Sequence, residues 1–175
     1  MSRKIYIVIS QTGTILSRIL KLVTGAEYNH ASISLSDDLS QMYSFGRLHP
    51  YNPFLGGFVM ESPYAGTFKR FSKTKVVVLP VEISEETYKE IQKQCEEMYL
   101  ERGKYHYNYL GVGLAAFHIN FQKENCYYCS EFVKDVLKKY EIEGAEELQG
   151  IVQPIHFLSL PYTPSYCGRL SEYVV

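Results

Sequence analysis

Residues 29–36 have the sequence NHASISLS, and this stretch decides the fold of the chain. Apolar residues at positions 31, 33 and 35 alternate with His30 and two serines. Strict alternation is typical of a β-strand with one buried and one polar face. Asp37 and Asp38 favour a turn, and QMYSFGR at residues 41–47 predicts the returning arm of a hairpin. The pattern therefore places a histidine on the polar face of a half-buried strand.

The remaining elements mix strands with helices that do not alternate regularly. KIYIVIS and KVVVLPVEI predict two more strands, and Pro80 in the second indicates a sheet edge or a bulge. Residues 49–63 are rich in Pro, Gly and aromatics, which predicts a loop holding a short FVMES strand. Residues 151–162 predict one more strand, interrupted by Pro154. This order favours an α+β fold over a doubly wound one.

Two helices are well defined by pattern. Ser84 can cap the first, Gly103 can end it, and Cys95 lies on its apolar stripe as an expected core residue. The second covers CYYCSEFVKDVLKKY, with its charges arranged as the helix dipole prefers. A shorter helix is expected over residues 12–25, and residues 107–119 suit either a short helix or a packed loop.

Length and composition exclude several classes of protein. A chain of 175 residues suits one domain over residues 1–175. The net charge is −1 with no block of like charge, so we expect no nucleic-acid surface. The opening residues lack an apolar run long enough for a secretory signal or a membrane span, which predicts an intracellular protein. In that setting the four cysteines are expected to be thiols rather than a disulfide framework.

Cys126 and Cys129 form a C-x-x-C pair at the start of the second helix, and four roles compete for them. Zinc needs about four ligands, usually from two paired clusters, and the chain has only this pair. A dithiol redox pair suits a helix N-terminus but should follow a strand of a βαβ unit. Cys129 also lies on the apolar face, where it could simply pack. The fourth role is a nucleophile, which needs a base and a group that orients the base.

Among the five histidines, His30 is the candidate base, because it starts a strand whose other face is apolar. Pairing His30 with Ser44 across a turn centred on Asp37 would keep the apolar faces together, and Ser44 could then orient the imidazole. Glu61 is the alternative, and its charge would also stabilise an imidazolium.

Four segments together, YNHASISLS, YSFGR, GKYHYNYLG and YYCSEFVKDVL, resemble the circularly permuted branch of the NlpC/P60 papain-like superfamily. This branch includes the YaeF/YiiX-type cysteine amidases and, more distantly, proteins like lecithin:retinol acyltransferase. In the permuted members, the histidine strand precedes the cysteine helix, as it does here. The resemblance spans roughly residues 4–140 and implies an antiparallel sheet with the nucleophile-bearing helix packed against it.

The resemblance implies Cys129 as the nucleophile and His30 as the base of a cysteine peptidase or amidase (a thiol hydrolase). It also implies that Tyr107 assists the oxyanion. The third residue departs from the family pattern, where a carboxylate, His, Asn or Gln is usual, and Ser44 or Glu61 would serve. No metal or organic cofactor is implied, and the substrate would be a peptide-like, cell-wall-derived or lipid-like amide or ester. A non-catalytic binding module and a Cys126/Cys129 dithiol oxidoreductase are the alternative functions.

Overall fold

A computed structural model describes residues 2–12, 27–115 and 119–174, and its strands form one eight-stranded sheet. The strand order is β7-β6-β4-β3-β2-β1-β5-β8. All neighbouring pairs are antiparallel except β6 and β7. The predicted α+β class is confirmed, and the expected helix over residues 12–25 lies outside the described residues apart from Thr12. The strands are β1 (Ser2–Gln11), β2 (His30–Ser34), β3 (Met42–His49), β4 (Asn52–Glu61), β5 (Lys75–Ser84), β6 (His106–Tyr107), β7 (Cys126–Tyr127) and β8 (Tyr166–Arg169).

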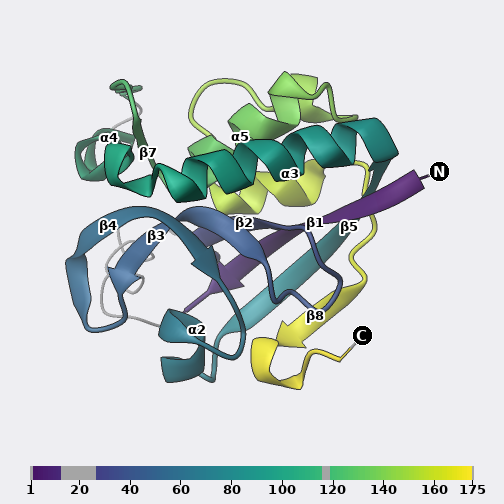
Figure 1. Ribbon diagram of the computed structural model, residues 1–175, viewed down its shortest axis with the longest axis horizontal. Coiled ribbons are helices and arrows are strands. Elements are labelled where there is room, and N and C mark those ends of the chain that lie inside the picture. Colours follow the sequence, from purple (N-terminus) through teal and green to yellow (C-terminus); the bar gives the residue numbers. More distant parts are fainter. Residues whose placement is uncertain (1, 13–26, 116–118, 175) are drawn as a thin grey trace.

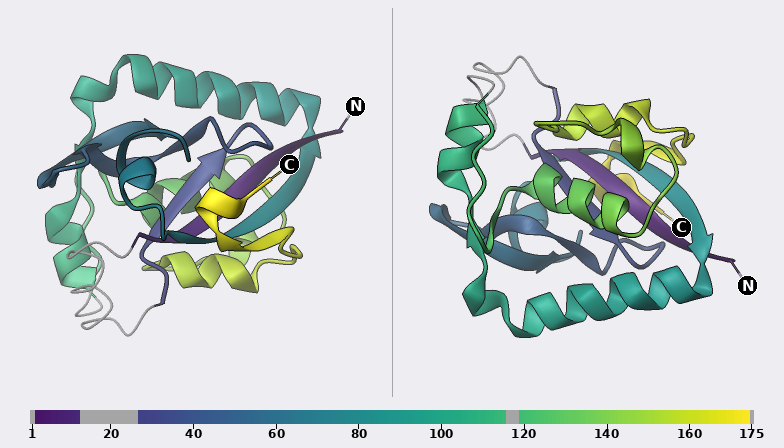
Figure 2. Two further views of the ribbon diagram at one scale, coloured as in Figure 1. Left: turned by 90° about the horizontal axis from the view of Figure 1, so that it is seen from below. Right: turned by 90° about the horizontal axis from the view of Figure 1, so that it is seen from above.

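Helices cover both faces of the sheet (Figure 1). The long helix α3 (Glu85–Leu100) and helix α5 (Cys129–Lys139) lie on one face, and the short helix α2 (Gly66–Arg70) lies on the other. Seen from above, α5 lies over the middle of the sheet, and α3 runs along one side (Figure 2). Helix α4 (Tyr109–Ala115) lies beyond the end of α3 near β7. The remaining helical turns are 3₁₀: η1 (Arg102–Lys104), η2 (Ala145–Glu147), η3 (Pro154–Ser159) and η4 (Leu170–Glu172).

The larger core lies between the sheet and helices α3 and α5. Its centre is an aromatic cluster around Phe45, whose ring lies 5.3 Å from Phe58, 5.1 Å from Tyr127 and 5.8 Å from Phe132. Such ring pairs stabilise a core beyond the area that they bury. A smaller core on the opposite face packs Met42 and Phe68 against β1 and β5. The two cores follow the predicted alternation, with positions 31, 33 and 35 in the larger one.

Most predicted strands are present, and the position of Pro80, the N-cap of α3 and the burial of Cys95 agree with the sequence. β1, β2, β3 and β5 lie where the patterns predict them. Pro80 lies beyond the part of β5 that pairs with β8, which ends at Val78, so its missing N–H faces an open edge. Ser84 accepts a hydrogen bond of 3.0 Å from the Thr87 N–H and caps α3 as expected. Cys95 is a fully buried core residue, also as expected.

Three sequence predictions are wrong. The 49–63 loop is mostly strand, because β4 pairs with β3 from Asn52 to Glu61 and this pairing overrides a composition rich in Pro and Gly. Residues 151–162 form the 3₁₀ turns of η3 rather than a strand, with Pro154 at the first turn, where its ring is tolerated. The second helix begins at Cys129, three residues later than predicted, because Cys126 and Tyr127 pair with β6.

Helix α4 settles the alternative left open over residues 107–119, in favour of a short helix. Among the described residues, no helix is both long and apolar enough to cross a membrane.

We expect Phe45→Ala to lower the free energy of unfolding by about 3–5 kcal/mol, because it opens a cavity at the centre of the aromatic cluster. The matched control is Phe54→Ala, since Phe54 is 84% exposed and its loss should change stability by less than about 0.5 kcal/mol. Urea unfolding followed by circular dichroism measures both variants. Equal stability of the two would contradict the position of this core.

Candidate active site

Cys129 is the first residue of helix α5, and its side chain is only 4% exposed. The preceding Tyr128 is extended and forms the N-cap. At this position the Cys129 N–H has no acceptor within the helix, so it can donate to another group. The Cys129 Sγ lies 4.0 Å from the carbonyl oxygen of Asn29, the residue before the β2 strand. The helix therefore brings the predicted nucleophile to the start of the histidine strand.

A buried polar network holds the first turns of α5. The Ser130 hydroxyl donates to the Val152 carbonyl at 2.6 Å, and Lys134 donates to the Gly150 carbonyl at 3.2 Å. The Glu131 carboxylate accepts hydrogen bonds from Gln122 at 2.9 Å and from the Tyr128 N–H at 3.4 Å. Because buried polar groups are expensive to leave unpaired, these bonds strongly restrain the helix start that carries the sulfur.

His30 is paired with Glu61 rather than with Ser44. The His30 Nε2 lies 2.8 Å from Glu61 Oε2, and both side chains are 12% exposed. The Ser32 hydroxyl donates to the same carboxylate oxygen at 3.0 Å. Glu61 thus occupies Nε2, which leaves the Nδ1 side of the ring for another partner.

Cys129 also acts on His30. Burial lowers the pKa of His30, but the Glu61 charge and hydrogen bonds with Cys129 and Glu61 outweigh burial and raise this pKa from 6.5 to about 10. The imidazole is therefore protonated at neutral pH, with the Glu61 carboxylate 2.8 Å from its Nε2. Since the folded pKa is above the ordinary one, this interaction stabilises the fold fully below pH 6.5 and is lost as the pH rises through about 10.

Gly46 makes room for this pair. A Cβ at Gly46 would lie 3.1 Å from Glu61 Oε1 and 3.4 Å from His30 Cε1. The ring of Phe68, from α2, lies 6.1 Å from the His30 ring and closes the site on the other face. A side chain at position 46 would therefore press on both charged groups.

Tyr107 reaches the sulfur from strand β6. Burial, and then the charge of Cys129, raise the pKa of the Tyr107 phenol well above its usual range, and a hydrogen bond with Cys129 adds to the effect. The phenol is therefore neutral at working pH and can donate a hydrogen bond beside the nucleophile. The structure pairs His30 with Glu61, the alternative third residue, and Cys129 is among the groups that act on both His30 and Tyr107.

Asn108 clamps the segment that follows Tyr107. Its carboxamide donates to the Phe121 carbonyl at 2.9 Å and accepts from the Gly111 N–H at 2.8 Å. A Cβ at Gly111 would collide with this carboxamide, so only glycine fits there. Sequence reasoning missed this clamp, although the Asn-x-x-Gly spacing at the start of a helix is typical of such caps.

Asn29 is a second residue that sequence reasoning missed. Its side-chain Nδ2 is buried, and among the described residues it has no hydrogen-bond partner. A buried donor without an acceptor is costly, and in a native protein it needs an explanation. The Asn29 backbone contacts Cys129 Sγ, so the unpaired donor belongs to the residue that touches the nucleophile.

Ser44 does not orient the histidine. Its hydroxyl donates to the Ala31 carbonyl at 2.6 Å, inside the β2–β3 pairing. Pairing His30 with Ser44 would place Ile33 opposite Gln41, but the structure pairs Ile33 with Tyr43, two residues further along. Because the register differs by two residues, each side chain stays on its predicted face of the sheet, but Ser44 no longer lies opposite His30. Ser32, on the His30 face of β2, supplies the hydroxyl instead.

The other cysteines differ in their surroundings. Burial raises the pKa of Cys95 to about 12, which makes it a poor nucleophile. Cys126 is half-buried in β7, Cys167 is exposed, and all four cysteines are free thiols. No group of three or more His, Cys, Asp or Glu side chains among the described residues could hold a metal ion.

Comparisons with protein-family models, with curated proteins and with solved structures find no match to this chain.

We expect the His30 imidazole of the wild-type protein to titrate near pH 10 and that of Glu61→Gln to titrate much lower. The reason is that the variant removes the carboxylate charge while the ring stays buried, so burial then lowers the pKa with less opposition. Nitrogen NMR of histidine-labelled protein follows both midpoints directly.

Ser44→Ala is the matched control, because the Ser44 hydroxyl bonds to the Ala31 carbonyl and its loss should leave the midpoint unchanged. A wild-type midpoint near 6.5, or a midpoint that does not respond to Glu61→Gln, would show that the His30–Glu61 pair is not formed in solution.

Proposed function

We propose that this protein is a cysteine-nucleophile hydrolase, an amidase or peptidase on a permuted papain-like fold. The observation that carries the proposal is the buried His30–Glu61 pair at 2.8 Å, together with the Cys129 sulfur 4.0 Å from the carbonyl oxygen of Asn29, the residue next to His30. A nucleophile, a base and an orienting acid in this order define the active site of cysteine hydrolases. The order of the chain, with the histidine strand before the cysteine helix, supports the permuted fold.

The raised His30 pKa keeps the imidazole protonated at rest, and in the proposed mechanism the imidazolium stabilises the Cys129 thiolate. The Cys129 thiolate attacks the carbonyl carbon of an amide, and the imidazolium then gives its proton to the leaving nitrogen as the C–N bond breaks. The neutral imidazole next takes a proton from water, whose oxygen attacks the thioester. The C–S bond breaks, a carboxylic acid leaves, and the thiolate–imidazolium pair is restored. An ester substrate would follow the same steps, and none of them uses a metal ion or an organic cofactor.

Three donors belong to Cys129 itself or to residues that act on it, and they could hold the oxyanion. They are the Cys129 N–H at the start of α5, the neutral Tyr107 hydroxyl and the unpaired Asn29 carboxamide. An oxyanion that forms on the substrate would accept the hydrogen bond that Asn29 otherwise lacks. Donors that are already in place are the largest single contribution in many acyl-transfer enzymes.

The two alternative functions make less use of these residues. A dithiol oxidoreductase needs Cys126 and gives no role to Glu61 or Tyr107. A binding module on the same fold needs neither an imidazolium nor a thiolate. Burying two such charges is costly, and a binding module would gain nothing from that cost. Hydrolysis accounts for all of these side chains with one mechanism.

We expect 4-nitrophenyl acetate to acetylate Cys129 of the wild-type protein, as measured by intact mass and peptide mapping. His30→Ala should slow this acetylation by at least about a hundredfold, because the base is lost. Cys129→Ala should abolish it, whereas Cys126→Ser should leave the rate within about twofold, since Cys126 lies outside the proposed mechanism.

Cys95 is the internal reference, because its burial predicts that it stays unmodified. If exposed Cys167 is acetylated but Cys129 is not, the binding module is the better reading. Loss of function in Cys126→Ser would instead favour the oxidoreductase.

We expect Asn29→Leu to slow acylation of Cys129 by about a hundredfold, the effect of removing one oxyanion donor. Leucine has nearly the same size and carries no unpaired donor, so the free energy of unfolding should stay equal or increase. Single-turnover acylation and urea unfolding measure the two effects. A stability loss without a change in rate would assign Asn29 a purely structural role.

A further inference from the structure

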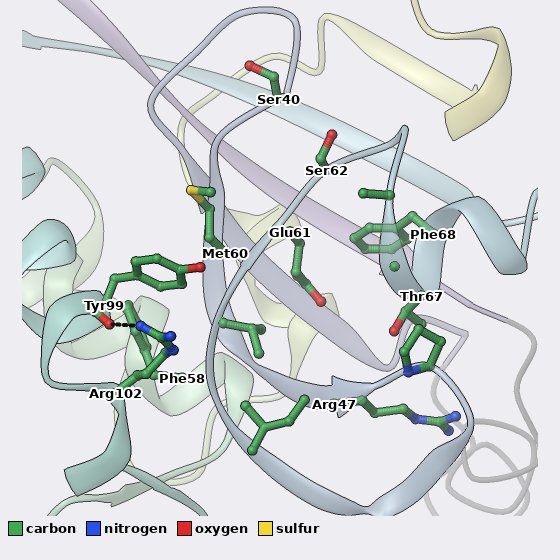
Figure 3. A pocket seen from close by; sticks show the side chains of 15 residues that line it. Ser40, Arg47, Phe58, Met60, Glu61, Ser62, Thr67, Phe68, Tyr99 and Arg102 are labelled. Carbon is green, nitrogen blue, oxygen red and sulfur yellow. Dashed lines mark hydrogen bonds between the residues drawn. The ribbon is translucent and has the colours of Figure 1, made fainter.

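A cavity of about 300 Å³ opens beside Glu61, between β3, β4 and α2. Hydroxyl groups of Ser62 and Thr67 line it together with Arg47, and Figure 3 shows Arg47 on the opposite side from Tyr99 and Arg102. Its one acid, Glu61, is already paired with His30 and Ser32. The carboxylate of the cavity therefore already has partners, whereas its guanidinium groups form no ion pair among the described residues.

Arg47 has no carboxylate partner. Its side chain is half-buried, and among the described residues neither an ion pair nor a hydrogen bond engages the guanidinium. The groups whose charges act on it are Tyr107, Tyr109 and a second cation, Arg70. Burial is the largest cause and lowers the pKa of Arg47; Arg70 also lowers this pKa, whereas Tyr109 and Tyr107 raise it.

The stretch that supplies most of the cavity lining offers no other acid, and Glu101, between the lining residues Tyr99 and Arg102, is paired with Lys104 at 2.7 Å. Between residues 39 and 81, Glu61 is the one acid, against the five cations Arg47, Lys69, Arg70, Lys73 and Lys75. The stretches at 13–26 and 116–118 contain no Asp or Glu either. The other guanidinium of the cavity, Arg102, donates to the Tyr99 carbonyl at 3.0 Å and stacks on the Tyr99 ring.

Arg47 shares the cavity with Glu61 and lies near Tyr107. It pairs with Gly56 in the β3–β4 ladder, and a Cβ at Gly56 would lie 2.8 Å from the Cβ of Tyr107. The Arg47 charge lowers the pKa of the Tyr107 phenol, which in turn bonds to Cys129. A guanidinium without an ion-pair partner among the described residues is thus on the residue opposite Gly56, against which Tyr107 packs.

From this geometry we infer that the substrate carries an oxyanion, a carboxylate or a phosphate, next to its acyl group, and that Arg47 binds it. Guanidinium groups bind both oxyanions through paired hydrogen bonds. This inference rests on the proposed function, because it names the substrate class for the same Cys129 site.

Two alkylating agents test it without a known substrate. Iodoacetate and iodoacetamide have nearly the same size and differ in charge, and both alkylate a thiolate by displacing iodide. The rate at Cys129 is measured by peptide mapping for each reagent, and their ratio is compared between wild type, Arg47→Met, Arg47→Lys and Lys69→Met. Because protonated His30 also attracts an anion, the decisive quantity is the change in this ratio on substitution.

We expect Arg47→Met to lower the iodoacetate-to-iodoacetamide ratio at Cys129 by at least about tenfold. Arg47→Lys should retain part of the wild-type preference for iodoacetate. In both Arg47 variants the rate with iodoacetamide should stay nearly constant. Lys69→Met removes the same charge from the exposed side of α2 and should leave the ratio unchanged. An unchanged ratio in Arg47→Met, or an equal fall in Lys69→Met, would overturn the inference while the hydrolase proposal stands. If Cys129 reacts with neither reagent, both proposals fail.

Protection experiments identify the oxyanion. Succinate or inorganic phosphate should slow the alkylation of wild-type Cys129 by iodoacetamide and should not slow that of Arg47→Met. Stronger protection by succinate assigns a carboxylate-bearing substrate, and stronger protection by phosphate assigns a phosphate ester. Protection by neither anion would overturn the role of Arg47.

Discussion

The interaction on which the site depends is the 2.8 Å contact between His30 and Glu61, two ionisable side chains that are each 12% exposed. Either charge alone would be costly at this depth, so each one needs the other. The requirement constrains the sheet, because His30 is on β2, Glu61 is on β4, and β3 runs between them. Contact across β3 is possible where Gly46 has no side chain, and Ser32 supplies a further hydrogen bond to the same carboxylate oxygen.

The sulfur depends on a different set of bonds, made by residues far away in the chain. Cys129 meets Asn29 across a separation of 100 residues, and neither belongs to a local motif that could form by itself. Helix α5 carries the sulfur, and its own polar residues hold it: Ser130, Glu131 and Lys134 bond to segments on both sides. The histidine is therefore positioned by the sheet and the cysteine by the packing of one helix, so the pair exists only when the whole fold is formed. This separation explains why the approach of Cys129 to His30 cannot be read from spacing.

The periodicity of the sequence predicted which face of an element each residue occupies. It did not predict strand register or hydrogen-bond partners, which depend on residues far apart in the chain. The period of two placed His30 opposite the apolar face of β2, and the helical period placed Cys95 in the core. The partner of His30 depended on register, and a turn longer by two residues moved Ser44 to the Ala31 carbonyl. Strand β4 was hidden by its glycines: Tyr107 and Tyr109 approach Gly56 closely, and the Tyr105 carbonyl approaches Gly57. Asn29 carried no signal in the sequence, since a lack of partners becomes visible only in three dimensions.

Among the ionisable groups of the site, His30 and Glu61 compensate each other, Tyr107 is neutral, and Arg47 has no acidic partner among the described residues. Glu61 compensates the charge of the protonated His30 ring, and in the proposed function this ring stabilises a thiolate at Cys129. Burial keeps Tyr107 neutral, so its proton remains available beside the sulfur. Arg47 is the cation that none of these groups compensates, and it acts on the site through Tyr107. A site whose internal charges balance, and whose rim keeps a guanidinium without an ion-pair partner among the described residues, attracts anionic groups to the rim. In the proposed function, this unbalanced charge would select the substrate, and the balanced charges would serve the chemistry.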